Sequence, residues 1–141
     1  MKTKKTDSYK RSQVETADQL SLILMLYDRA ILLLEKAKNE ISEKNYEEKH
    51  HYLTKASNIV YELLASLDID KGGEIADSLS RLYSFVIREI LDADKNLNIK
   101  ALDMAITTLS ELRTSWEGIK DNPNTRMPDT DPRETSMNLS G

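Results

Sequence analysis

Apolar residues recur every three or four positions along most of this chain. From about residue 17 to about residue 118 the spacing follows the 3.6-residue period of an α-helix, not the alternation of a β-strand. Glycine occurs in this stretch only at Gly72, Gly73 and Gly118, and proline does not occur in it. The pattern therefore predicts an all-α protein, because residues that break helices are scarce where the period is strongest.

Breaks in the period divide this stretch into consecutive segments. The predicted helices lie near 17–42, 46–67, 74–95 and 99–118. Thr16 and Gln19 have the spacing of a capping box, which marks the start of the first helix. Asn45 and Asn98 are suitable N-caps for the second and fourth helices. Similar helix lengths and short connections predict an antiparallel up-down four-helix bundle.

The two ends of the chain differ from this bundle in composition. The first eleven residues contain five lysines or arginines and one aspartate, so the remainder of the chain, whose total charge is -4, carries -8. Beyond residue 119 the chain is polar, contains all three prolines and shows no apolar period, so we expect it to be disordered. We therefore expect a flexible basic arm at 1–15, a bundle at 16–119 and a disordered tail at 120–141.

The first and third helices carry more apolar surface than one buried face needs. Apolar residues cover roughly 140–160° of the second and fourth helices, but roughly 200° of the first. Met25 and Leu32 lie seven residues apart in the polar wedge of the first helix, and Phe85 lies away from the apolar stripe of the third. Two interpretations remain open: a first helix that touches several neighbours, or a groove on the first and third helices for an amphipathic segment of another protein.

Several classes of function are disfavoured by the residues themselves. Without cysteine there is no disulfide or thiolate metal site. The net negative charge argues against nucleic acid as the main partner, and the apolar runs are too short between charges to span a membrane. Glu-x-x-His occurs twice at Glu47–His51, but both histidines are adjacent on the polar side of one helix, so we interpret them as a solvated turn. We expect no enzyme activity, no metal and no cofactor.

The order of several sequence blocks resembles that of a known family. The matching positions are Tyr9, Val14–Ile31, Lys55–Ile59, Glu62–Leu63, Ser66–Asp68, Gly72–Ala76, Leu79, Leu82–Tyr83, Leu109, Leu112–Arg113 and Trp116. Together they resemble the FliS family of flagellar secretion chaperones, from Tyr9 to Trp116. The chain departs from the family pattern at Asp18-Gln19, where Ser-Pro is usual, and at Arg29, where a small residue is common.

This resemblance implies a cytoplasmic four-helix chaperone for the disordered C-terminal segment of flagellin. Such a chaperone would prevent premature polymerisation and keep flagellin ready for the flagellar type III export apparatus, without a cofactor. The resemblance also implies that the arm around Tyr9 covers an apolar surface when flagellin is absent. We expect the partner-binding residues to be Tyr9, Val14, Leu22, Met25, Leu32, Tyr83 and Phe85. The alternative function is a helical adaptor that self-associates.

Overall fold

The computed structural model describes residues 4–121, with side chains described from residue 19 to residue 119 apart from 69 and 71. This part of the chain is helical throughout except for short turns, and it contains no strand. The helices are α1 (Lys4–Ser42), α2 (Tyr46–Ala65), α3 (Ile69–Asn96) and α4 (Ile99–Asp121). The all-α prediction is confirmed.

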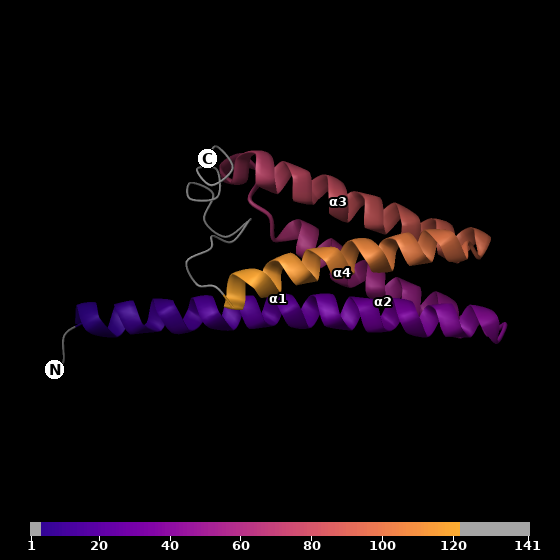
Figure 1. Cartoon of the computed structure of the whole chain (residues 1–141), viewed down its shortest axis with the longest axis horizontal. Helices are drawn as coiled ribbons and strands as arrows, with labels where there is room; N and C mark the ends of the chain where they lie inside the picture. The colour runs from indigo at the N-terminus through magenta and orange to yellow at the C-terminus, as the bar shows by residue number, and fades with distance from the viewer. Residues whose placement is uncertain (1–3, 122–141) are drawn as a thin grey trace.

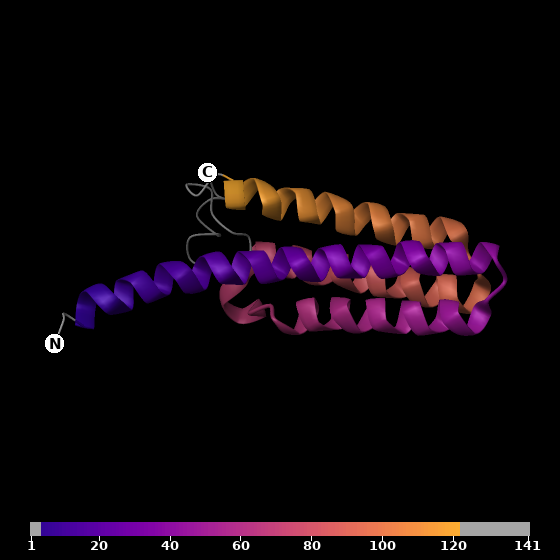
Figure 2. The same ribbon diagram turned by 90° about the horizontal axis from the view of Figure 1, so that it is seen from below.

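The four helices form an antiparallel bundle in which each helix packs against two others. α1 packs against α2 and α4, and α3 packs against the same two helices (Figures 1 and 2). α1 and α3 therefore lie diagonally opposite each other. Within the described residues α1 packs along α2 and α4, and a groove on the first and third helices stays a prediction.

The first helix begins much earlier than the sequence predicted. α1 starts at Lys4, so Thr16 lies inside the helix and its capping box does not mark the start. Nothing between Lys4 and Ser42 ends a helix, since this segment has no glycine or proline. The N-terminal part of α1 projects beyond the other three helices and does not fold back over the bundle (Figure 1).

The remaining helix limits agree more closely with the prediction. α2 ends at Ala65, and α4 continues to Asp121, while the predicted tail beyond it lies outside the described residues. α3 is interrupted at Gly73, whose φ of 58° and ψ of -139° separate a short N-terminal turn from the main helix. Gly72 has no room for a side chain, because a Cβ there would lie 2.3 Å from the Cβ of Ala76.

Backbone and side-chain caps end and begin the helices at the two remaining turns. After α1, Lys44 has a φ of 62°, its amide donates to the Ile41 carbonyl at 3.1 Å, and the Asn45 amide donates to the Glu40 carbonyl at 2.9 Å. This pair of bonds is a Schellman motif. Before α4, the Ala101 amide donates to Asn98 Oδ1 at 3.1 Å, which confirms that cap. Asn45 precedes α2 as predicted but makes no side-chain cap bond.

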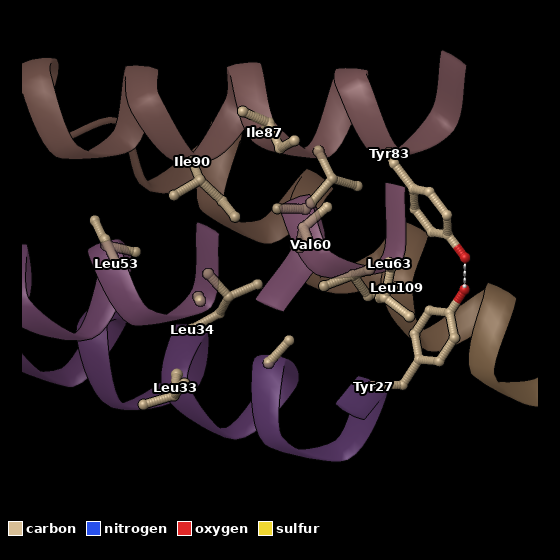
Figure 3. Close-up of a cluster of buried hydrophobic side chains, with 14 of the residues drawn as sticks. Tyr27, Leu33, Leu34, Leu53, Val60, Leu63, Tyr83, Ile87, Ile90 and Leu109 are labelled. Carbon is tan, nitrogen blue, oxygen red and sulfur yellow. Dashed lines mark hydrogen bonds between the residues drawn. The ribbon is translucent and has the colours of Figure 1, made fainter. Parts of the chain in front are cut away.

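The core lies along the axis of the bundle and draws on every helix (Figure 3). Its members recur at helical spacing, which confirms the predicted stripes of α2 and α4. The largest fully buried side chains are Trp116, Tyr27, Tyr83, Leu34, Leu53, Ile90, Leu102, Leu109, Val60 and Val86.

Candidate functional site

The inward face of α1 takes part in a buried hydrogen-bond chain across the bundle. The hydroxyl groups of Tyr27 and Tyr83 lie 2.6 Å apart and share a hydrogen bond (Figure 3). The indole Nε1–H of Trp116 donates to Tyr27 Oη at 3.1 Å. These three side chains are at most 1% exposed. They therefore fasten the diagonal pair α1 and α3 to α4 through the core, where a buried hydroxyl or indole N–H needs a partner.

The outward face of α1 carries a row of exposed apolar side chains. Leu22, Met25 and Leu32 are 58%, 63% and 49% exposed. Residues three, four and seven positions apart share one face of a helix, so these three lie on one side together with Arg29 and Lys36. We call the five residues Leu22, Met25, Arg29, Leu32 and Lys36 the α1 strip.

No other helix in the described part of the chain presents a comparable apolar row. On α3, Leu82 and Leu91 are exposed, but nine residues at 100° per residue place them on opposite sides of the helix. On α2, Tyr46 and Tyr61 are four turns apart, and Met104 is the single large exposed apolar side chain on α4. Isolated apolar residues are normal on a surface, whereas a row of them is typical of a binding face.

The charges around the α1 strip are held in different ways. The Asp28 carboxylate, beside the strip, accepts hydrogen bonds from Nε and Nη2 of Arg113 on α4. Hydrogen bonds from Arg113 to Asp28 and Glu117 raise the pKa of its guanidinium. Lys36 Nζ lies 5.7 Å from the ring centroid of Tyr52 on α2. Arg29 is exposed between Met25 and Leu32, and its side chain makes no ion pair and no hydrogen bond with the described residues.

The structure separates the predicted partner-binding residues into three groups. Leu22, Met25 and Leu32 come together on the α1 strip. Tyr83 is buried, and Phe85 is half-buried and packs against the core, so α3 does not present them as open surface. Tyr9 and Val14 fall on the projecting part of α1, where the side chains lie outside the described ones. In this conformation that segment continues α1 as a curved helix that extends beyond the other helices (Figure 2), so it does not fold back over the bundle.

A polar cluster that sequence analysis missed joins the start of α2 to the end of α3. Lys49 is 6% exposed, and its Nζ donates to the backbone carbonyl of Asp94 at 2.8 Å and to Asp94 Oδ1 at 2.7 Å. His50 Nδ1 lies 2.6 Å from Asp94 Oδ2. Burial raises the pKa of the Asp94 carboxyl, but the hydrogen bonds and charges of Lys49 and His50 outweigh burial and lower it. The sequence did indicate that Lys49 is buried, because Lys49 lies on the same apolar stripe of α2 as Leu53 and Ala56.

The double Glu-x-x-His pattern leads to no metal centre in the structure. The His51 ring lies 6.2 Å from that of Tyr52, and His50 is occupied by Asp94. The described side chains contain no group of three or more histidine or carboxylate residues placed to hold a metal ion. Among these residues, too, no helix is long and apolar enough to cross a membrane.

One protein-family model matches the part of the chain that contains all four helices. The model of the family described as flagellar protein FliS matches residues 1–123. The flagellar secretion chaperone FliS of Salmonella typhimurium is 37% identical over 109 residues, which cover 77% of this chain and 81% of that protein.

Two further relatives bear similar names. The flagellar secretion chaperone FliSB of Pseudomonas aeruginosa is 31% identical over 108 residues, covering 77% of this chain and 86% of its own. The flagellar secretion chaperone FliS of Bacillus subtilis is 26% identical over 110 residues, covering 78% and 81%. With a matching family model along most of its length, a predicted and observed helical bundle and these relatives, the chain belongs to the FliS family of flagellar proteins.

Proposed function

We propose that this protein is a cytoplasmic export chaperone that binds the disordered C-terminal segment of flagellin. Binding would keep flagellin from polymerising early and hold it ready for flagellar type III secretion. Membership of the FliS family and the chaperone names of its relatives support the export role. The observation that carries the binding proposal is the α1 strip, a row of apolar side chains that no other part of the described chain covers.

The α1 strip suits a partner that folds as it binds. The strip from Leu22 to Leu32 is about 15 Å long, the length of roughly three helical turns. A disordered segment can order into an amphipathic helix along such a row, although its ordering costs free energy. Each apolar anchor that becomes buried contributes roughly 1.5–3 kcal/mol. Several anchors together therefore offset the ordering, without any cofactor.

The decisive experiment replaces two anchors of the strip by carboxylates. We expect Met25→Asp with Leu32→Asp to weaken binding of a flagellin C-terminal segment roughly a hundredfold or more, because two buried anchors are lost. The binding is measured by isothermal titration calorimetry with a synthetic segment of the flagellin from the same genome. The matched control is Leu91→Asp with Met104→Asp, two residues of similar exposure on α3 and α4.

The outcomes separate this proposal from its alternative. Binding by the control and loss of binding by the strip variant support the chaperone function at this surface. Equal binding by both variants would move the flagellin site away from the α1 strip. If the parent protein binds no flagellin segment and light scattering shows a dimer that the strip variant abolishes, then the strip joins two copies and the protein is a self-associating adaptor.

A further inference from the structure

The α1 strip has a cation at its centre, and this position sets the chemistry of what can cover it. Arg29 follows Met25 by four residues and precedes Leu32 by three, so all three side chains share one face of α1. A helix that covers the two apolar anchors must therefore also cover the guanidinium. Lys36 lies on the same face, seven residues after Arg29, which is about 10.5 Å along the helix.

Arg29 also differs from Lys38 and Arg113 in having no ion-pair partner among the described residues. Lys38 Nζ is bound to Asp103 at 2.8 Å, and Arg113 holds Asp28 and Glu117. By contrast, Arg29 forms no ion pair with any described residue, although Asp28 precedes it directly. The carboxylate that could have neutralised Arg29 is thus already engaged by α4. Within the described residues, the guanidinium of Arg29 therefore remains exposed and unpaired, so a carboxylate of a partner can reach it.

Covering an unpaired guanidinium with an apolar helix is unfavourable, since the charge loses water and gains nothing. A carboxylate opposite Arg29 reverses that balance and also fixes the register of the partner. We infer that the α1 strip selects an amphipathic helix that carries two carboxylates about seven residues apart, one facing Arg29 and one facing Lys36, with apolar residues between them. This inference rests on the proposed function and specifies the ligand of the same surface.

The test is a charge-swap experiment on chaperone and ligand together. Binding of the flagellin C-terminal segment is titrated against the parent, Arg29→Glu and Lys36→Glu at low and at high salt. Arg88→Glu is the control, since Arg88 is an exposed cation on α3, away from the strip. We expect Arg29→Glu to weaken binding about tenfold at low salt and by much less at high salt, because salt screens an interaction between charges. The control should change affinity less than about twofold.

Rescue identifies the partner group. Each carboxylate of the segment is replaced in turn by lysine, and one replacement should restore most of the affinity of Arg29→Glu while weakening binding to the parent. A second replacement about seven residues away should do the same for Lys36→Glu.

Three results would overturn the inference. One is an Arg29→Glu variant that binds like the control. Another is an Arg29→Leu variant that binds more tightly than the parent, which would show a purely apolar contact. The third is a loss of affinity that no lysine replacement rescues. In each case the parent still binds flagellin and the proposed function stands, whereas a parent that binds no flagellin segment overturns both.

Discussion

The two faces of α1 contain similar apolar residues, but one face is buried in the core and the other is exposed to solvent. Toward the core, Tyr27 and Leu34 are completely buried. Toward solvent, Met25 and Leu32 are about half exposed or more. Because α1 packs against only two helices, residues that fall outside those two contacts stay uncovered, however apolar they are. The position of a side chain relative to the neighbouring helices, more than the apolar content of the helix, separates core from candidate binding surface.

The same contrast holds for two cations. Lys49 is buried at the bundle end and has both a carboxylate and a carbonyl of Asp94 as acceptors. Arg29 is exposed and has no acceptor among the described residues. A buried charge requires a partner within the folded protein, whereas an exposed charge is solvated by water and can pair with a group of another protein. The buried cation Lys49 therefore has its acceptors within the protein, whereas Arg29 on the α1 strip has none among the described residues.

The largest expected effect on the free energy of unfolding comes from a substitution in the core. Trp116→Ala should lower the free energy of unfolding by roughly 3–5 kcal/mol, because it empties a large volume and removes the donor to Tyr27. Urea denaturation followed by circular dichroism measures the change. A variant that melts like the parent but no longer binds its partner would make Trp116 a contact residue and would break the comparison.

The buried cation should show the next largest effect. Asp94→Asn keeps the shape of the side chain but removes the charge beside Lys49, and should lower the free energy of unfolding by about 2–3 kcal/mol. The control is Asp77→Asn, whose exposed ion pair with Arg81 should contribute less than about 1 kcal/mol. Equal effects of the two changes would show that burial of Lys49 does not matter.

The pH dependence of the same pair gives an independent test. The pKa of Asp94 is lowered in the folded protein, because Lys49 and His50 outweigh the effect of burial. Its stabilisation is therefore fully present above the unfolded pKa of about 4 and is lost as the pH falls through the folded value. Denaturation curves at several pH values should show the parent losing its advantage over Asp94→Asn below about pH 4. A constant difference down to pH 2 would contradict this.

A single hydroxyl group in the core should have a smaller effect. Tyr83→Phe keeps the ring and removes the 2.6 Å hydrogen bond to Tyr27, so it should lower the free energy of unfolding by about 1 kcal/mol. Thermal melting with Tyr61→Phe, a change at an exposed ring on α2, provides the comparison. If Tyr83→Phe instead weakens partner binding without affecting melting, Tyr83 must become accessible when the partner binds.

The smallest effect on stability is expected on the outside. Met25→Asp with Leu32→Asp should change the free energy of unfolding by no more than about 0.5 kcal/mol, the usual range for surface positions. Leu33→Asp, one residue away but turned into the core, should unfold the protein under the same conditions. The melting temperatures of these variants test the assignment of the two faces directly. Collapse of the double variant would show that the strip belongs to the core.

Periodicity predicted the fold well because each helix obeys it locally. The helices and the burial of Trp116 follow from spacings within one helix, the Asn98 cap follows from residue type, and the bundle follows from helix lengths and short connections. The predicted start of α1 at Thr16 was wrong. A capping box shows that a helix can begin at a residue, but the residues before Thr16 can also be helical, and the helix continues through them. The exposure of Leu22, Met25 and Leu32 agrees with the predicted surplus on the first helix.

The parts that were missed depend on which helices meet. The helical spacing of Tyr83 with Leu79 and Val86 indicates a buried position, but its hydrogen bond to Tyr27 depends on how α1 and α3 face each other. Lys49 could have been found, since it lies on the apolar stripe of α2, but its partner Asp94 lies on another helix.

The order in which the helices pack around the bundle also affects how fast the chain can fold. Within the described residues, three of the four pairs of packed helices follow each other along the chain, and the fourth pair, α1 and α4, joins its distant parts. Helical bundles dominated by such local contacts fold within microseconds to milliseconds. The bond from Trp116 to Tyr27 spans 89 positions and forms only when α4 meets α1. The fluorescence of the chain's one tryptophan therefore measures the rate at which α4 packs against α1 during folding.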